Sequence, residues 1–590
     1  MAEAVQVERG PRWHTPVDLL ALAVAATAMA LVWLSEVIGH WSTRTATRGD
    51  GQFQAWTIDW VQGAILRQHP LWNAGIYHPS PRSLAFSDHL LGVSAALLPL
   101  RALGLSPAAQ LNTAIVIGSV LDAWAAYLLI RVLLRRRAPA LVAGVAFVAG
   151  PFQHQLALQL HMLWRPGLPV AVALVWIVAD RRGDVGAWAH LPSDRWLAVL
   201  LGVVVAWQGL VSFYDAVSLG LVLVVVVLVR VRHLGRVGVG LVAAATAVGG
   251  VLVAFTLPPY LANVRGYEGF KRTLDETVAF RGRLFQVEAS NRLWGGLAPV
   301  TEGLPAFAGL TLTVLALVGV VAAVVGRRRH GRSAPGWDAA RLGIWCVVVG
   351  AVLALGASGS GLGRWSPFGV LFRFVPGFSV VRAPGRLWVI GLLGLVVLAA
   401  RGVVVLVDAI ARTAVGRRVP AAITTGLVVL VLAGAVVAEG AAKPEGTGPA
   451  ARTPIDETLA SRPGDGAVLY LPIGESGIGV ILNGADDVYR STTHHRPILN
   501  GYSGFAPEST QVLAEELAAL PRSSALACLV RTGTDYVVVT PAVLGGPWEP
   551  LLDPANAAPL ELVQRSGREV LYAVPEGLDV DPADCPLPSP

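Results

Sequence analysis

Long runs of apolar residues recur along the 590-residue chain and are separated by short polar segments. A run of roughly 15–25 apolar residues is long enough for a helix to cross a bilayer. The run at 89–104 is short and contains Pro99 and Arg101, so we expect it to lie at the membrane surface or to re-enter the membrane without spanning it. The remaining runs predict about eleven spanning helices, at residues 17–38, 109–131, 138–152, 164–180, 195–213, 215–230, 237–257, 304–326, 340–357, 386–410 and 420–438.

Basic clusters between these runs predict the orientation of the chain. When 89–104 is not counted as a span, the clusters all fall on one side, and cytoplasmic loops retain Lys and Arg. We therefore expect a multi-pass protein of the plasma (inner) membrane with a cytoplasmic N-terminus. The run at 17–38 continues past an Ala-rich stretch resembling a cleavage site, so we expect it to be retained as the first span. The clusters lie at 131–137, 180–182, 230–236, 326–332 and 412–418.

The sequence changes in kind after the last apolar run. The segment EGAAKPEGTGPAARTP at 439–454 is rich in Pro and Gly, which is typical of a linker. Short β-like runs at 467–473, 536–540 and 569–574 then alternate with a helical pattern at 508–520, which predicts a small α/β domain. The expected domains are a transmembrane domain at 1–439 with a first outer loop at 39–108, a linker at 440–454 and an extracytoplasmic α/β domain at 455–590.

Composition supports this class of protein. Hydrophobic residues make up 54% of the chain and charged residues 14%, whereas soluble domains typically have about 25% charged residues. The net charge of +7 comes from arginines clustered between spans, so we expect no nucleic-acid partner. Of the three cysteines, Cys346 lies in a predicted span, whereas Cys528 and Cys585 lie in the outer domain, where disulfides are permitted. The sequence leaves open whether these two form a bridge.

The predicted outer side carries the residues suited to chemistry. The stretch RGDGQFQAWTIDW at 48–60 contains Asp50 and Asp59 among the aromatic residues Trp56 and Trp60. A carboxylate at a membrane surface can act as a general base. Asp50 is the main candidate, because Gly49 and Gly51 predict a flexible turn around it. Asp59, and Asp88 with its neighbour His89, are the other candidates in this loop.

Further candidates follow in later outer segments. Arg373, Arg382 and Arg386 lie among apolar residues at the outer end of a span, where guanidinium groups could hold a phosphate. His154 and His161 are seven residues apart and are expected to share a helix face as the wall of a site. That spacing is too wide for the usual i, i+4 metal pair, so no metal site is predicted. Trp164 could stack on a sugar, and His495 and Tyr502 in STTHHRPILNGYSGF could contact an acceptor.

Each candidate has a structural alternative. Aromatic residues at a membrane boundary often form an interfacial belt, which applies to Trp60 and its neighbours, and Arg386 could only anchor the end of a span. Asp59 fits a helix-surface or ion-pair residue better than a second catalytic acid. Asp122 lies within a span, where acids are rare and functional by default, and a structural hydrogen bond or ion pair inside the bundle is an equal alternative. The 491–505 segment could be an internal loop of the outer domain.

The order of these segments resembles the GT-C superfamily of membrane glycosyltransferases, in a branch of uncharacterised bacterial proteins. The resemblance rests on GDGQFQAWTIDW, YHPSPRSLAFSDHLLG, RVLLRRRAPALVAGVAFVAGPF and LHMLWRPGLPVAVALVWIVADRR in the first 180 residues, and on FVPGFSVVRAPGRLWVIGLLGLVVLAARG and YRSTTHHRPILNGYSGFAPES later. It implies a polyprenyl-phosphate-linked sugar donor, a glycan, glycolipid or protein acceptor, and a catalytic acid in the first outer loop. Asp50 and Asp59 are nine apart and form no tight acidic pair, so a divalent metal is not indicated and the cofactor stays unknown.

Two other classes of function remain open. A transporter or flippase of an envelope component is expected to have ionisable groups or broken helices near mid-membrane, where only Asp122 and Gln208 are plausible. A non-catalytic envelope assembly protein could use the same architecture to bind a polymer without needing Asp50.

Overall fold

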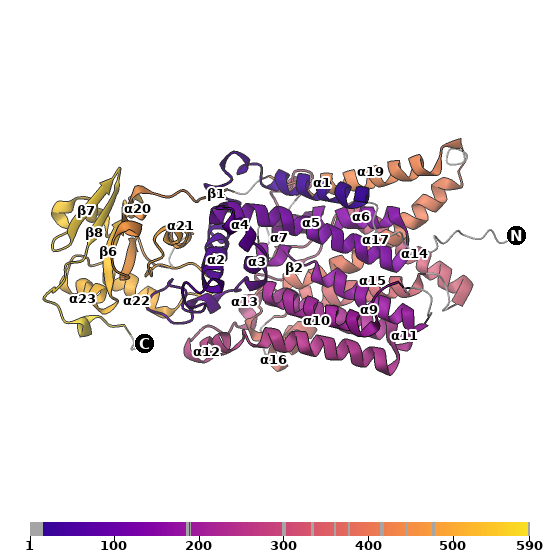
Figure 1. Cartoon of the computed structure of the whole chain (residues 1–590), viewed down its shortest axis with the longest axis horizontal. Helices are drawn as coiled ribbons and strands as arrows, with labels where there is room; N and C mark the ends of the chain where they lie inside the picture. The colour runs from indigo at the N-terminus through magenta and orange to yellow at the C-terminus, as the bar shows by residue number, and fades with distance from the viewer. Residues whose placement is uncertain are drawn as a thin grey trace. The chain divides into compact units, whose positions relative to one another are not determined.

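The computed structural model describes residues 16–157, 159–183, 188, 190–297, 303–331, 336–358, 361–375, 378–413, 418–443, 446–474 and 478–587 (Figure 1). These residues form two compact units, each assembled from separate stretches of the chain. Unit 1 takes its described residues from Met1–Ser35, Ala114–Thr256 and Lys271–Pro444. Unit 2 takes its described residues from Glu36–Thr113, Leu257–Phe270 and Glu445–Pro590.

Unit 1 is built almost entirely of helices. Its helices are α1 Pro16–Trp33, α6 Arg137–Ala149, α7 Pro151–Ala157, α8 Leu160–Leu163, α9 Gly167–Gly183, α10 Asp194–Val211, α11 Phe213–Ala254, α13 Leu274–Val278, α14 Leu310–His330, α15 Trp337–Ala354, α16 Pro367–Phe374, α17 Trp388–Ala411 and α19 Ala421–Gly440. Helix α5, Pro107–Leu134, contains the boundary between the units. Two short parallel strands, β2 Gly282–Arg283 and β3 Leu304–Pro305, lie in the loop before α14.

Nine of the described helices are long and apolar enough to cross a membrane, which confirms the predicted helical, polytopic membrane protein. The number differs from the prediction for two reasons. Helix α11 covers the predicted spans 215–230 and 237–257, which meet at Gly235, where a φ of +60° interrupts the helical backbone. Helix α6, in the predicted span 138–152, has only 13 residues.

The apolar run at 89–104 forms no spanning helix. It folds into α3, Leu91–Ala96, and α4, Leu98–Ala102, and neither is long enough to cross a bilayer, which takes about 20 residues. This agrees with the expectation that the run does not span the membrane.

Unit 2 combines the first long loop with the C-terminal sheet. Its elements are β1 Arg44–Thr45, α2 Asp50–Ile65, α3, α4, α12 Pro258–Gly266, β4 Gly448–Pro449, α20 Pro454–Ser461, β5 Ala467–Leu471, α21 Ile478–His494, α22 Glu508–Leu517, α23 Ser523–Arg531, β6 Thr534–Val539, β7 Glu561–Ser566 and β8 Glu569–Ala573. The predicted strands correspond to β5, β6 and β8, and the predicted helix to α22, whereas β7, α21 and α23 were not predicted.

The four strands form one mixed sheet in the order β5-β6-β8-β7. Strands β5 and β6 are parallel, and β6, β8 and β7 are antiparallel neighbours. Side chains alternate between the two faces of a strand, so Leu469 and Leu471 pack with residues of α22 and α23 on one face. On the other face, Tyr470 packs in a cluster that includes Trp56 and Phe86 of the first loop. The sheet therefore has a buried core on both faces.

Segments that are far apart in the sequence belong to the same compact unit. The first loop and the tail belong to one compact unit, and β4, inside the expected linker, pairs antiparallel with β1 of the first loop. The domain boundaries at 439 and 455 remain a prediction. Packing between segments some 400 residues apart is a tertiary property that no local composition reveals.

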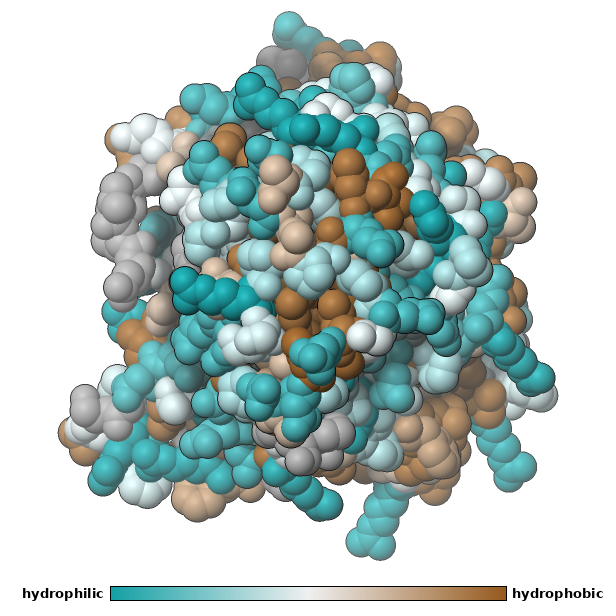
Figure 2. All heavy atoms as spheres, turned by 90° about the vertical axis from the view of Figure 1, so that its left-hand side faces the viewer, coloured by the Kyte–Doolittle hydropathy of each residue, from teal (hydrophilic) through white to brown (hydrophobic). Residues whose placement is uncertain are grey.

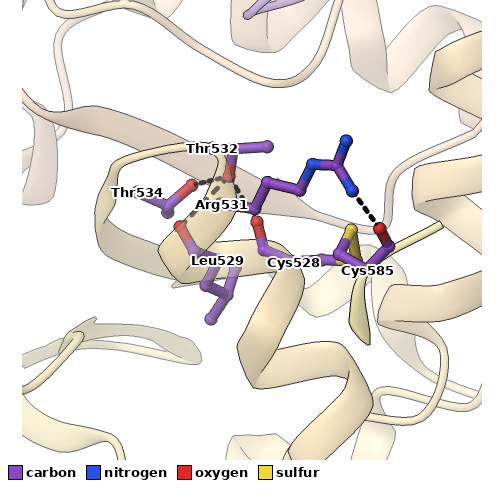
Figure 3. Close-up of a disulfide and its surroundings, with 6 residues drawn as sticks. All are labelled: Cys528, Leu529, Arg531, Thr532, Thr534 and Cys585. Atoms are coloured by element: carbon purple, nitrogen blue, oxygen red, sulfur yellow. Dashed lines mark hydrogen bonds between the residues drawn. A yellow bond between two sulfur atoms is a disulfide. The ribbon is translucent and has the colours of Figure 1, made fainter. Parts of the chain in front are cut away.

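The two cysteines of the C-terminal domain form a disulfide (Figure 3). Cys528 in α23 is bonded to Cys585, with a Cα–Cα distance of 4.9 Å. The guanidinium of Arg531 also donates a hydrogen bond to the backbone carbonyl of Cys585. The C-terminal segment is thereby tied to α23, which settles the pairing that the sequence left open.

Figure 2 shows the face of the molecule that carries the C-terminal sheet. Hydrophilic residues, in teal, predominate on this face, and hydrophobic residues, in brown, form small separate patches. Isolated apolar side chains on a mainly polar surface are normal for a domain in contact with water.

Candidate functional site

Asp50 is the first residue of α2. The flexible turn predicted around Gly49 and Gly51 is therefore wrong at Gly51, which lies within the helix. Gly49 precedes the helix with a φ of +85°, a conformation that a glycine adopts readily. Two side chains then fix the helix start, because the Gln52 side-chain oxygen accepts from the Gly49 N–H at 3.1 Å and Thr47 Oγ1 accepts from the Gly51 N–H at 3.1 Å. Gly49 alone therefore forms the turn, and the two hydrogen bonds fix the position of Asp50 at the start of α2.

The Asp50 carboxylate is half-buried and interacts with a residue of the tail. The hydroxyl of Tyr502 donates a hydrogen bond to Asp50 Oδ1 at 2.8 Å, and the Tyr502 ring lies 5.9 Å from the ring of Phe53. The first turn of a helix favours negative charge, because its N–H groups point toward that end. This position therefore suits an ionised carboxylate.

Asp59 is an ion-pair residue, as its structural alternative expected. Arg101 Nη1 lies 2.6 Å from Asp59 Oδ1, and His495 Nδ1 lies 3.8 Å from Asp59 Oδ2. His495 therefore faces the first loop within unit 2. Because Arg101 occupies Asp59 Oδ1, this acid is less available to an acceptor hydroxyl, and Asp50 is the better candidate of the two.

Asp88 and His89 follow a short 3-10 helix in the same loop. His89 is 2% exposed, its Nδ1 accepts from the Leu91 N–H at 3.1 Å, and burial lowers its pKa to about 4. A histidine with this pKa is neutral at pH 7. The Tyr260 hydroxyl donates to the backbone carbonyl of Ser87 at 2.8 Å, and its burial, together with the nearby charge of Asp88, raises its pKa.

The three candidate tryptophans are packed or hydrogen-bonded inside their units. Trp56 is 2% exposed and stacks between Phe53 and Trp60. Trp60 donates to the Leu71 carbonyl at 2.9 Å. Trp164, in unit 1, is 2% exposed and donates to the Ala114 carbonyl at 2.8 Å. The burial of Trp56 and Trp164 argues against the expected stacking on a sugar.

Two of the predicted arginines gather around Tyr214 in unit 1. The backbone N–H groups of Arg382 and Ala383 both donate to the Tyr214 hydroxyl at 3.1 Å. The Arg386 guanidinium lies over the Tyr214 ring, 5.0 Å from its centroid, and the Arg382 guanidinium lies 4.4 Å from the centroid of Phe280. Both guanidinium groups therefore rest on aromatic faces, an arrangement to which arginine is suited.

Neighbouring polar groups complete this cluster. Arg386 donates to the Gln159 side-chain oxygen at 2.6 Å, and its Nη1 lies 3.5 Å from His161 Nε2. Burial, followed by the positive charge of Arg272 and weakly by that of Arg386, lowers the pKa of Arg382. Arg382 is thus repelled by both Arg272 and Arg386, while Glu276, whose Oε2 lies 3.9 Å from Arg272 Nη1, supplies a negative charge nearby. We call Arg272, Arg382 and Arg386 the arginine cluster.

The remaining predicted residues lie apart from these groups. Arg373 stacks over Trp365, with its guanidinium 5.1 Å from the ring centroid. His154 lies in α7 with its Nδ1 3.6 Å from Glu288 Oε2, whereas His161 lies in α8, so the expected shared helix face is wrong. Within the described residues, no three His, Cys, Asp or Glu side chains are grouped as a metal site would require.

In the 491–505 segment the internal-loop alternative is observed, and the acceptor contact of His495 and Tyr502 remains a prediction. His494 is 8% exposed and its Nε2 lies 2.9 Å from the Tyr470 hydroxyl, as an internal loop requires, whereas His495 and Tyr502 face the acids of the first loop. The predicted structural ion pair in the bundle is confirmed, because Asp122 lies 3.2 Å from Arg165 and neither side chain is exposed.

Sequence reasoning missed Arg272, Tyr214 and Gln159. The sequence did contain a signal for Arg272. It stands next to Lys271 on the side predicted to be outside, where basic residues are depleted. The tyrosine and the glutamine had no comparable signal.

No protein-family model matches the chain, and no curated protein matches it in sequence. Solved structures do match its fold. The oligosaccharyltransferase of Archaeoglobus fulgidus, in its apo form, aligns with a TM-score of 0.52 and 13% identity over 89% of this chain and 70% of that one. The arabinofuranosyltransferase AftD from mycobacteria aligns with a TM-score of 0.54 and 16% identity over 94% of this chain, which spans 41% of AftD.

A third structure, ArnT from Cupriavidus metallidurans in the apo state, aligns with a TM-score of 0.47 and 15% identity over 98% of this chain and 100% of that one. These are distant likenesses, and they bear on the fold. With its nine apolar helices long enough to span a membrane among the described residues, the chain shares the overall polytopic fold of the A. fulgidus oligosaccharyltransferase and of mycobacterial AftD.

Proposed function

We propose that this protein is a membrane glycosyltransferase that moves a sugar from a polyprenyl-phosphate donor to a cell-envelope acceptor at the outer leaflet. The fold supports the general class. The observation that carries the proposal is the Asp50 carboxylate, which sits at the start of α2 in the first long loop and accepts a hydrogen bond from Tyr502. This is the loop in which the resemblance to the superfamily expects a catalytic acid.

In the proposed reaction, Asp50 removes the proton from an acceptor hydroxyl as its oxygen attacks the anomeric carbon of the donor sugar. The bond between that carbon and the phosphate oxygen breaks, and the phosphate leaves with the electron pair. From the sequence, we assign the phosphate to Arg382 and Arg386, since guanidinium groups hold phosphates by charged hydrogen bonds. No step requires a metal ion.

The acceptor is a glycan, glycolipid or protein of the envelope. The oligosaccharyltransferase of A. fulgidus has been solved tethered to an acceptor peptide containing the NVT sequon, so a protein acceptor is among the candidates. We place the protein in the plasma (inner) membrane, with its N-terminus in the cytoplasm and its C-terminal α/β domain outside.

Kinetics of the purified protein with polyprenyl-phosphate sugars test the two roles separately. Asp50→Asn should lower kcat by about 10²–10⁴ and nearly retain donor affinity, because general-base catalysis acts on turnover. Arg382→Ala should instead weaken donor binding by about 1.5–3 kcal/mol, the value of a charged hydrogen bond. Arg364→Ala is the matched control, since Arg364 stacks on Trp365 outside the arginine cluster.

An Asp50→Asn enzyme that transfers sugar at the wild-type rate would contradict the assignment of the base. The acid would then have to be sought at Asp59 or Asp88. A wild-type protein that transfers no sugar from any lipid-linked donor would favour transport or envelope assembly instead.

A further inference from the structure

The contact between Asp50 and Tyr502 depends on the absence of a side chain at position 49. A Cβ on Gly49 would lie 2.9 Å from the Tyr502 hydroxyl oxygen and 3.1 Å from Leu482 Cδ2. Both distances are shorter than ordinary van der Waals contacts. Gly49 therefore makes the turn before α2 and also leaves the space through which Tyr502 reaches the carboxylate.

The chain just before Tyr502 is held on both sides. On one side it pairs with the first loop, because the Tyr77 N–H donates to the Asn500 carbonyl at 2.9 Å and the Ile498 N–H donates to the Gly75 carbonyl at 2.7 Å. On the other side the Asn500 side chain accepts from the Tyr470 N–H and donates to the Tyr470 carbonyl, both at 2.8 Å. The segment is thus bonded to the first loop and to β5 at once.

The start of α2 is held by the tail as well. Helices α2 and α21 lie side by side (Figure 1). Asp486 in α21 accepts from Arg48 at 2.6 Å and from the Gln52 side chain at 2.5 Å, and Asn483 accepts from Arg48 at 3.1 Å. Arg48 and Gln52, two residues before and two residues after Asp50, are therefore tied to α21.

We propose that Tyr502 is a positioning residue for Asp50, and that the tail of unit 2 thereby holds the base of the first loop in its reactive orientation. The inference rests on the proposed function. A hydrogen bond to Oδ1 restricts rotation of the carboxylate and so limits the directions from which it can meet an acceptor hydroxyl. The role is separate from acceptor binding, which the sequence predicted for Tyr502.

The test is a double-mutant cycle on the purified full-length protein, assayed with a polyprenyl-phosphate sugar and its acceptor. Tyr502→Phe removes only the hydroxyl, and it should lower kcat by about tenfold to a hundredfold, the range for loss of one charged hydrogen bond, with KM nearly unchanged. In an Asp50→Asn background the same substitution should cost less than about twofold, because residues that act as a unit are not additive. If Asp50→Asn is too slow to assay, Asp50→Glu, which displaces the carboxylate from the hydroxyl, serves as the background.

Tyr267→Phe is the matched control. The Tyr267 hydroxyl also lies in unit 2 and donates to the Pro81 carbonyl at 3.2 Å, so its loss removes a phenol hydrogen bond without touching Asp50. We expect turnover of this variant to stay within about twofold of wild type, because this partly buried hydrogen bond does not involve Asp50.

The outcomes separate the inference from the proposed function. Wild-type turnover in Tyr502→Phe, or an equal loss in the Asp50 variant background, would overturn the positioning role and leave Asp50 as the base. A rise in KM with unchanged kcat would also overturn it, in favour of acceptor binding. Full activity in Asp50→Asn would instead contradict the base assignment itself.

Discussion

Residue by residue, the candidate acids of the first loop differ in what surrounds them. Asp59 faces Arg101 at 2.6 Å, whereas Asp50 faces a neutral hydroxyl from a residue 452 positions away in the chain. Because Arg101 already occupies Asp59 Oδ1, this oxygen is less available to an acceptor hydroxyl. The neighbours of each acid, more than its place in the loop, therefore favour Asp50 as the candidate base.

A prediction at this scale concerns His89 and pH. Burial lowers its pKa to about 4 from the ordinary 6.5, so the unfolded chain binds a proton more readily than the folded one between these values. Its contribution to stability is complete above pH 6.5 and is lost as the pH falls toward 4, by up to about 3 kcal/mol. His89→Asn keeps an acceptor for the Leu91 N–H and removes the titration.

We therefore expect the melting temperature of wild type to fall more than that of His89→Asn between pH 7.5 and 4.5. Buried His494, with its pKa lowered to about 3, contributes to both proteins alike and leaves the difference intact. His40→Asn, at an exposed histidine of the same unit, should keep the wild-type pH dependence. If the melting temperatures of wild type and His89→Asn fall equally between pH 7.5 and 4.5, His89 is not buried in its neutral form.

At these residues, some contacts could be predicted from the sequence and others could not. An ion pair for Asp59 and one for Asp122 could be expected, because an unpaired acid in apolar surroundings is costly. The hydroxyl of Tyr502 next to Asp50 could not, because nothing in either segment encodes its approach to the other. The buried positions of Trp56 and Trp164 were missed for the same reason, since an aromatic residue near a membrane boundary suits a core and a surface equally well.

Among the elements, glycines set how closely the helices of unit 1 approach. A Cβ on Gly319 of α14 would meet the backbone carbonyl of Leu398 in α17, and one on Gly402 of α17 would meet the carbonyl of Leu315 in α14. Small residues at such contacts let helix backbones come together in a membrane. Helices α14 and α17 therefore pack through backbone at these positions.

Gly319→Ala should destabilise the protein by about 1–3 kcal/mol, because the added methyl has no space between the helices. Gly326→Ala is the control on the same helix, since a Cβ there meets nothing within 4 Å. Thermal unfolding in detergent, followed by size-exclusion fluorescence, should show a lower midpoint for the first variant only. Equal midpoints for both variants would rule out the close α14–α17 contact.

Helices were predicted correctly where a continuous run of apolar residues defines them, and incorrectly where the local sequence suggested another structure. A long apolar run predicts a span because crossing a bilayer requires consecutive apolar residues, and the run at 89–104 was excluded on the same ground. The start of the helix at Asp50–Ile65 was missed, because two glycines there suggested a turn. The break at Gly235 and the short α6 together explain why the helix count differs from the number of predicted spans.

For the molecule as a whole, the topology remains to be tested. The proposed orientation puts the Arg137 end of the chain in the cytoplasm and the C-terminal α/β domain outside. Single cysteines introduced at positions 137 and 500, in separate otherwise unchanged proteins, can be labelled in intact cells with a membrane-impermeant thiol reagent. Because Asn500 is buried, exposed Arg568 in the same domain is a further labelling position.

We expect labelling at 568, and at 500 after unfolding of the outer domain, but none at 137 until the membrane is permeabilised. The native outer cysteines are bonded to each other and Cys346 is buried, so the background should be low. Labelling at 137 but not at the tail positions in intact cells would invert the topology. Such a result would also move the proposed chemistry to the cytoplasmic leaflet.

The central claim is that the protein transfers a sugar to a cell-envelope acceptor and uses Asp50 to do so. The most direct measurement is mass spectrometry of envelope glycans from a strain lacking the gene, complemented with the wild-type chain or with Asp50→Asn at matched expression. We expect the deletion to lack one sugar substituent, the wild-type chain to restore it, and the Asp50→Asn chain to restore little or none of it. Identical glycans in all strains, or full restoration by Asp50→Asn, would contradict the account.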